Sequence, residues 1–203
     1  MEIKTIVLGG IGTNCYLISS DNAAIVIDPG FECQEAAEFL NVNNLKERLI
    51  LLTHCHFDHI GFAKDLSEKT NTKIAIGELD AEGLNDNNVN LSNLFGLPLK
   101  NFNADIELKD KSILKVGDIE INVIHTPGHT IGGSCYLIDD VLFAGDTLFC
   151  ESIGRTDFPG GDFGVLNASI KKLFSLPDET VVYSGHGPIT TIAHEKLYNP
   201  FIR

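Results

Sequence analysis

The stretch THCHFDH, residues 53–59, constrains this chain most, because it gathers three histidines and an aspartate within six positions. It directly follows the apolar run RLILL, which is typical of a buried strand. Alternate side chains of an extended segment point the same way, so His54 and His56 can face one cation. Asp58 and His59 lie past the bend and can face a second cation. Because these residues cannot surround a metal ion alone, the fold must bring further ligands to them from other loops.

Three other short stretches of the sequence follow predicted apolar strands, and each contains a potential metal ligand. His129 lies in TPGHT, Asp146 in FAGDT and His186 in SGHGP, and glycines flank all three and permit tight turns. With the first stretch they give five imidazoles and two carboxylates as candidate metal ligands: His54, His56, Asp58, His59, His129, Asp146 and His186. Nitrogen and oxygen ligands of this kind suit Zn²⁺, which we expect first, and also Fe or Mn²⁺.

The candidate ligands divide into two sets that share one carboxylate. One metal would use His54, His56 and His129, and the other would use Asp58, His59 and His186. Asp146 can bridge them, since a carboxylate has an oxygen for each metal. Two metals about 3.5–4 Å apart can share a water and make hydroxide available as a nucleophile. We therefore expect a catalytic centre in which Asp58 and Asp146 act with a metal-bridging hydroxide, rather than a closed, four-coordinate structural site.

The remaining sequence alternates between apolar runs and helical patterns, which indicates an α/β protein with helices outside its sheets. Short runs rich in Val and Ile predict buried strands within 23–30, 48–56, 72–78, 119–130, 135–147 and 180–188. Helices are predicted at 34–40, at 62–70 and within DFGVLNASIKKLFSLP, where Asp162 is the expected N-cap. The asparagine-rich residues 79–104 are expected to form a long loop or short helices that either wall a substrate pocket or merely pack.

Length, charge and cysteine usage narrow the class of protein. The 203 residues are expected to form a single domain, 1–203. A net charge of −13 without a basic cluster disfavours a nucleic-acid partner. No membrane-length apolar run or signal peptide is recognisable, so no membrane partner is expected. Five cysteines without CxxC spacing favour reduced thiols and a cytoplasmic location. The sequence makes no prediction of oligomeric state.

The motif HxHxDH, followed by histidine in PGHT, aspartate in GDT and histidine in GHG, resembles the metallo-β-lactamase-fold hydrolases over nearly the whole chain. The resemblance implies a four-layer αββα sandwich with the metals at one edge of two facing sheets. Within the superfamily, GDTLF, IGRTDFPGGD and GHGP…EKLYNPF are most similar to short, single-domain glyoxalase II-like (hydroxyacylglutathione hydrolase-like) proteins. That likeness implies hydrolysis of S-lactoylglutathione or a related small-molecule thioester. Common di-zinc β-lactamases carry cysteine where Asp146 stands, which speaks against their activity.

The chain departs from full-length glyoxalase II in the parts that hold glutathione. It ends seventeen residues after His186, so it is expected to lack the C-terminal helical domain that binds glutathione in that enzyme. A lysine and a tyrosine that contact glutathione there correspond to Arg155 and Asp157. Arg155 could pair with a substrate carboxylate, or it could pair with Asp157 and hold the loop. Asp28, at the end of a predicted strand, is expected either to receive the second N–H of a ligand histidine or to cap the strand.

Two other activities on this fold remain open. Persulfide dioxygenases resemble this sequence in THCH-DH and GRTDF, and they bind a single iron, for which the resemblance carries over His54, His129 and Asp146 as ligands. The ending SGHGP favours the hydrolases. A lactonase would use the same hydroxide against an oxoester. Two other residues are expected to be structural. His125 lies four residues before His129, but Pro127 and Gly128 between them rule out a helix that would place the two rings side by side. The side chain of Cys55 is expected to point away from its neighbours His54 and His56.

Overall fold

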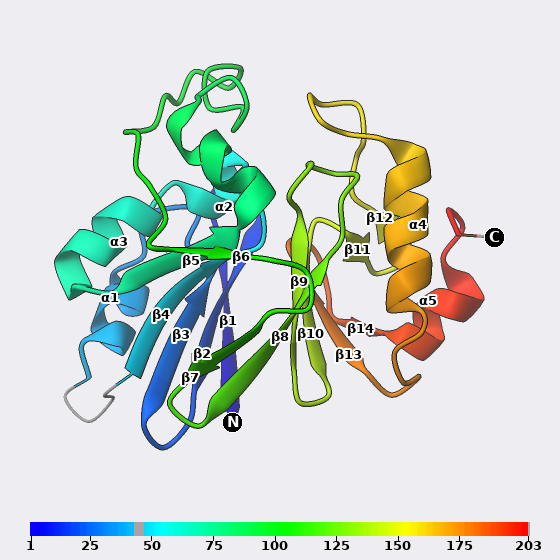
Figure 1. Ribbon diagram of the computed structural model, residues 1–203, viewed down its shortest axis with the longest axis horizontal. Helices are drawn as coiled ribbons and strands as arrows, with labels where there is room; N and C mark the ends of the chain where they lie inside the picture. Colours follow the sequence, from blue (N-terminus) through cyan, green and yellow to red (C-terminus); the bar gives the residue numbers. More distant parts are fainter. Residues whose placement is uncertain (43–46, 203) are drawn as a thin grey trace.

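Two six-stranded sheets face each other in the computed structural model, and helices cover the outer face of each (Figure 1). The structure describes residues 1–42 and 47–202. From one side of the molecule to the other the layers are helices, sheet, sheet and helices, as the αββα expectation requires. Among the described residues, no helix is long and apolar enough to cross a membrane.

The first sheet combines two antiparallel hairpins with a parallel half. Its strands lie in the order β1 (Glu2–Leu8), β2 (Thr13–Ser19), β3 (Ala23–Ile27), β4 (Glu47–Leu52), β5 (Lys73–Gly77) and β6 (Ile106–Leu108). From β3 to β6 the pairing is parallel. β3 is buried along its whole length, because a parallel sheet has both faces covered.

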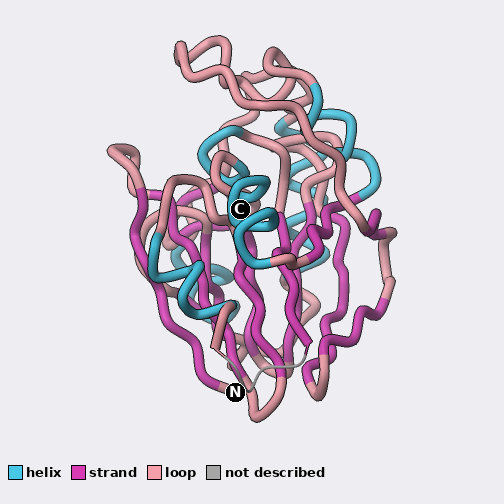
Figure 2. Tube along the Cα trace, turned by 90° about the vertical axis from the view of Figure 1, so that its left-hand side faces the viewer, coloured by secondary structure: helices cyan, strands magenta, loops and turns pink. Residues whose placement is uncertain are grey.

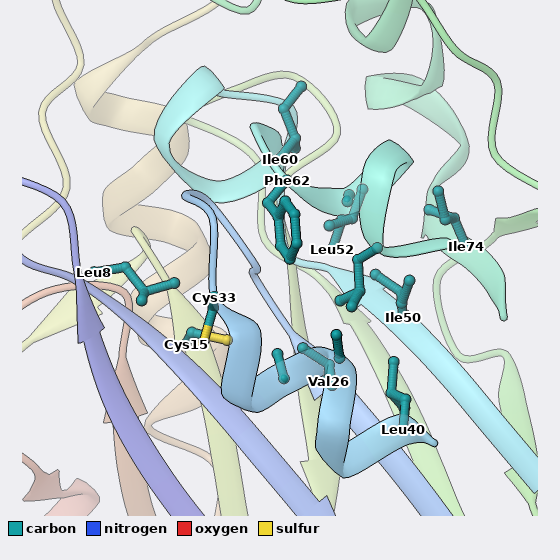
Figure 3. Close-up of a cluster of buried hydrophobic side chains, with 14 of the residues drawn as sticks. Leu8, Cys15, Val26, Cys33, Leu40, Ile50, Leu52, Ile60, Phe62 and Ile74 are labelled. Atoms are coloured by element: carbon teal, nitrogen blue, oxygen red, sulfur yellow. The ribbon is translucent and has the colours of Figure 1, made fainter. Parts of the chain in front are cut away.

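Helices α1 (Gln34–Leu40) and α3 (Ala63–Thr70) cover the outer face of this sheet. Their apolar sides pack on β4 in one continuous cluster, in which Leu40, Ile50 and Leu52 are fully buried. Figure 3 shows this cluster, which includes Phe62, the residue that directly precedes α3. Burial of each such side chain contributes about 1.5–3 kcal/mol, so this layer fixes where β4 ends.

The second sheet is mostly antiparallel. Its order is β14 (Thr190–Thr191), β13 (Val181–Ser184), β10 (Val141–Gly145), β9 (Ser134–Ile138), β8 (Ile119–His125) and β7 (Ile113–Val116). Helices α4 (Phe163–Leu173) and α5 (Ile192–Tyr198) cover its outer face. The Asp162 side chain accepts a hydrogen bond from the Val165 N–H, so the predicted N-cap of α4 is confirmed. The remaining elements are α2 (Phe57–Ile60), a 3₁₀ helix η1 (Glu78–Asn85), β11 (Leu148–Phe149) and β12 (Ser152–Ile153).

Three parts of the chain differ from the elements expected from the sequence or decide between two expectations. The run 135–147 is two antiparallel strands rather than one, because Asp139, with φ of 53°, turns the chain between β9 and β10. The strands β1 and β2 were not predicted. Residues 79–104 begin with η1 and continue as turns, and Leu91 and Phe95 from this segment line a cavity described below. Of the two roles expected for the segment, walling a pocket is therefore the one observed.

The carboxyl ends of five strands meet at one edge of the sandwich. β3 and β4 are parallel neighbours, as are β10 and β13, and β8 runs in the same direction as β10 because both pair antiparallel with β9. Figure 2 shows the long loops gathered at the end of the molecule opposite the N-terminus. Each predicted ligand follows one of these strand ends, so the topology alone brings the ligands together.

Candidate metal centre

All seven predicted ligands lie at this edge. His54 and His56 follow β4, Asp58 and His59 lie on α2, and the other three follow the second sheet: His129 after β8, Asp146 after β10 and His186 after β13. His59 is fully buried, whereas the side chain of His186 is 26% exposed. The centre is thus closed from below by the sheets and open on the side of His186.

The side chains fall into the two predicted sets. Within each set one ligand atom per residue lies within 4.8 Å of the others, and the sets are His54, His56 and His129, and Asp58, His59 and His186. The Asp146 carboxylate lies between them. Its Oδ1 is 3.4 Å from His59 Nε2, and its Oδ2 is 3.5 Å from His129 Nε2. Oδ2 is also 3.6 Å from His186 Nε2, so the carboxylate contacts ligands of both sets, which is the position of a bridging ligand.

The glycine at 185 is required for this arrangement. A Cβ atom there would lie 2.1 Å from Asp146 Oδ1 and 2.8 Å from His59 Cε1. The residue after β13 must therefore lack a side chain if Asp146 and His59 are to approach each other.

Three buried polar atoms of the centre have no hydrogen-bond partner among the described residues: His54 Nε2, His59 Nε2 and Asp146 Oδ1. An unsatisfied buried polar atom costs about 1–3 kcal/mol, so native folds rarely retain one without a partner. Here the three belong to the predicted ligands, and a cation would satisfy all of them. The donor set contains only imidazole nitrogen and carboxylate oxygen, which fits a pair of divalent metal ions.

The electrostatics keep most of these groups in the form that binds metal. Burial and the neighbouring imidazoles lower the pKa of His54 well below its usual value and that of His56 to about 3, so both rings stay neutral. Burial raises the pKa of Asp146, but the imidazoles of His59, His129 and His54 outweigh it and hold that pKa well below its usual value. Neutral imidazoles and ionised carboxylates are the forms that metals require.

His59 and His186 differ from His54 and His56, because neighbouring carboxylates outweigh burial and raise the pKa of each. Burial lowers the pKa of His59, but the carboxylates of Asp58, Asp146 and Asp28 outweigh burial and raise the pKa well above its usual value. Two of these carboxylates are themselves predicted ligands. A proton on His59 and a bound cation therefore compete for the same negative environment.

Hydrogen bonds behind the ligands fix their orientation. His59 donates its Nδ1–H to Asp28 Oδ2 at 2.9 Å, which is the first of the two roles expected for Asp28. Asp28 also accepts from the backbone N–H and the hydroxyl of Thr53, the residue before His54. His129 donates Nδ1–H to the Arg155 carbonyl at 2.7 Å, and so its Nε2 faces the centre. Such contacts select the tautomer of a ligand histidine.

A second buried carboxylate, Asp80 on η1, was missed by the sequence analysis. Its Oδ2 accepts from the Cys55 N–H at 3.0 Å and the Thr130 hydroxyl at 2.8 Å, and its Oδ1 accepts from the Gly132 N–H at 2.6 Å. Asp80 thereby ties the loop of His54 and His56 to the loop of His129. The signal was present in the sequence, because ELD follows the predicted strand TKIAIG, and β5 ends at the same edge as β4.

The two residues expected to be structural lie outside the ligand sets. His125 ends β8, and its Nε2 lies 3.0 Å from the Ile131 carbonyl. Cys55 lies in the loop after β4, where its side chain is buried against Gly83 in the apolar cluster under the helices of the first sheet, and burial raises its pKa well above the usual value.

A cavity of about 410 Å³ opens onto the centre. Arg155 lies at its wall, and its guanidinium donates to both oxygens of Asp157, at 2.7 and 2.6 Å. This hydrogen bonding holds the pKa of Asp157 at about 2. The guanidinium carbon also lies 3.8 Å from the centre of the Phe158 ring. Of the two roles expected for Arg155, the pair that holds the loop is the one observed.

Residues 8–186 match the family model of the metallo-beta-lactamase superfamily. The chain belongs to this superfamily. It is 38% identical to the hydroxyacylglutathione hydrolase GloC of Haemophilus influenzae over 213 residues, which cover all of this chain and 98% of that protein. The fold class expected from the sequence is therefore confirmed, and the protein is a metallo-β-lactamase-fold hydrolase.

Two solved structures are similar over almost the whole chain. The BLEG-1 B3 metallo-beta-lactamase is 40% identical, with a TM-score of 0.92 and coverage of 99% of both chains. The protein TTHA1623, solved in a di-iron-bound form, is 34% identical, with a TM-score of 0.86. The match covers 98% of this chain and 99% of the TTHA1623 chain. The first comparison weakens the sequence argument against β-lactamase activity, because a protein named as a lactamase is this similar to a chain that carries Asp146.

Proposed function

We propose that this protein hydrolyses acyl–thiol esters with two divalent metal ions held by the seven side chains of the centre. The observation that carries the proposal is the position of Asp146, whose carboxylate lies between the two three-residue sets and contacts histidines of both. The similarity to a protein named as a hydroxyacylglutathione hydrolase supports a thioester as the substrate.

When bound, such a pair of metal ions lowers the pKa of a shared water and supplies positive charge for the oxyanion that develops on the substrate. Asp146 holds the two sets at a fixed separation. The carboxylate of Asp58 lies at the cavity, where its Oδ2 accepts from the Thr13 hydroxyl at 3.1 Å and can accept a proton from the attacking water. Because a free thiol has a pKa near 8.5, a thiolate leaves without a general acid.

Zinc is the metal that we propose, because it suits a set of five imidazoles and two carboxylates and takes part in no redox chemistry. Iron is the alternative, since the similar protein TTHA1623 was solved with two iron ions. The metal content of protein purified from cells grown in defined metals would separate the two.

The function is tested by thiol release from S-lactoylglutathione with purified, metal-loaded protein and its Asp146→Ala variant. We expect release by the wild type and background release by the variant. Asp21→Ala is the matched control, because Asp21 is an exposed aspartate in the turn between β2 and β3. Equal turnover by wild type and Asp146→Ala would contradict the bridging role.

β-Lactam hydrolysis is the second candidate, favoured by the similarity to the BLEG-1 lactamase. It is tested on the same preparation with a chromogenic cephalosporin. A higher kcat/KM for the cephalosporin than for any thioester would replace the first proposal by the second. Oxygen uptake with a persulfide, at one iron per chain, would instead support the dioxygenase, and turnover of a lactone alone would support the lactonase.

A further inference from the structure

The walls of the cavity above the centre are apolar. Apart from the five ligands that form its floor and Arg155, every lining side chain is aliphatic or aromatic: Ile11, Phe57, Leu91, Phe95, Phe149, Ile153 and Phe158. They come from separate segments, including the turn after β1, helix α2, the residues that follow η1 and the β11–β12 hairpin. Ile11 is 53% exposed and Phe95 49% exposed, so the apolar surface continues to the rim.

The aromatic side chains begin directly beside the ligands. The Phe158 ring centre is 5.9 Å from that of His56, and the Phe149 ring centre is 6.1 Å from that of His186. Further out, the Phe95 ring lies 4.8 Å from the Phe57 ring. A substrate whose carbonyl carbon lies over the centre therefore has apolar side chains on both sides of its reacting group.

Among the described residues that line the cavity, no positive charge is free to hold an anionic substrate tail. Arg155 is the one Lys or Arg among its thirteen lining residues, and Asp157 occupies both N–H groups on one edge of the guanidinium. Phe158 covers the face of the same group. The net charge of the chain, −13, adds no attraction for an anion.

We propose that the cavity selects thioesters with an apolar acyl group, either a medium-length aliphatic chain or an aromatic ring, over those with a small hydroxyacyl group. The inference rests on the thioester hydrolysis proposed above and names its acyl substrates. A thiol with a polar or charged tail would keep that tail in solvent. The apolar wall of the cavity therefore contacts the acyl group of the thioester and not its thiol. Each added methylene that is buried should raise kcat/KM roughly three- to fourfold until the cavity is filled.

The test uses acetyl, butyryl, hexanoyl, octanoyl and phenylacetyl thioesters of one neutral thiol, N-acetylcysteamine, so that only the acyl group changes. We expect kcat/KM for hexanoyl to exceed that for butyryl about tenfold, and to exceed that for S-lactoylglutathione. Phe95→Ala should reduce the ratio of hexanoyl to acetyl turnover at least threefold. Phe163→Ala is the matched control, because Phe163 is 51% exposed and lies outside the cavity. A flat acyl series would overturn the inference, even with full turnover of S-lactoylglutathione.

A binding measurement separates this inference from the proposed function. The affinities of metal-loaded protein for acetate, butyrate, hexanoate and octanoate are compared by calorimetry. Affinity that rises with chain length, without hydrolysis of any thioester, would support the apolar acyl site and contradict thioester hydrolysis. Equal affinity for acetate and octanoate would overturn the inference whether or not thioesters are hydrolysed.

Discussion

The two halves of the metal centre are supported by two different buried aspartates. The set of His54, His56 and His129 contains no carboxylate of its own, and Asp80 ties its two loops together from behind. The second set contains Asp58, and its His59 is held by Asp28. In the first half the support reaches the ligands through the backbone and a neighbouring hydroxyl, whereas in the second half it reaches a ligand ring directly. Asp80 therefore supports the first half alone. Asp28 supports mainly the second half, but it also reaches the first, because the Thr53 hydroxyl that it binds lies 3.1 Å from His54 Nδ1.

The largest effect is expected from Gly185→Ala, which acts on both halves at once. The new Cβ would lie 2.1 Å from Asp146 Oδ1, so the bridging carboxylate must move. We expect loss of both metal ions and of thiol release, measured by metal analysis and by the thioester assay. Gly187→Ala is the control, because nothing lies within 4 Å of a Cβ there, although its φ of 78° strains an alanine. Full metal content in Gly185→Ala would show that the bridge tolerates displacement.

Asp28→Asn should weaken the second set. Asparagine has one accepting oxygen, and its NH₂ group can only donate. It therefore cannot accept the Nδ1–H of His59 together with both hydrogen bonds from Thr53, and the ring loses its fixed orientation. Loss of such a contact typically costs about 10- to 100-fold in metal affinity. Metal titration against a competing chelator should show a large weakening of the step at the second set. The step at the first set should weaken less, because Asp28 reaches His54 only through Thr53. Equal weakening of both steps would mean that the halves are coupled beyond Asp146.

Asp80→Asn should weaken the first set in the same titration, by a smaller factor because Asp80 contacts no ligand side chain. The amide can accept at only one oxygen, whereas Asp80 accepts three hydrogen bonds. A buried donor left unpaired costs about 1–3 kcal/mol, so the melting temperature should also fall. Glu82→Gln, an exposed acid on the same 3₁₀ helix, is the control. If only the metal affinity of the second set fell, Asp80 would not support the first set.

The smallest effect is expected at the rim, from Asp157→Ala. It frees the guanidinium of Arg155 from an exposed ion pair, and such pairs contribute little. We expect kcat/KM for the glutathione thioester to rise about threefold relative to the N-acetylcysteamine thioester of the same acid, and the metal content to stay unchanged. An unchanged ratio would mean that Phe158, rather than Asp157, keeps Arg155 from the substrate.

The positions of the ligands could be predicted because each directly follows a short apolar strand. Carboxyl ends of strands that run in one direction meet at one edge of a sheet, so a sequence pattern becomes a spatial cluster. Asp28 was found by the same argument. Asp80 was not, because it lies beyond Gly77, the last residue of β5, in the segment 79–104, which was expected to be a long loop or short helices.

Other features depend on tertiary packing that no local pattern records. β1 is an edge strand with mostly exposed side chains, so its sequence lacks a buried apolar run. β2 is buried along almost its whole length, but its sequence, TNCYLIS, mixes polar and apolar residues. The sequence left two roles open for Arg155, and its contacts with Asp157 and Phe158 form only through the folded loop. The apolar cavity could not be predicted either, since Ile11, Phe95 and Phe149 come from separate segments that only the fold brings together.

The central claim is that Asp146 joins two metal-binding sets into one catalytic centre. It is tested most directly by counting the zinc ions bound per chain after loading and gel filtration, in parallel with thiol release, for the wild type and Asp146→Ala. We predict two ions per wild-type chain, with release reaching its maximum only at the second equivalent, and fewer than one retained by the variant. Maximal release at one ion per chain, or two ions retained by Asp146→Ala, would contradict the account.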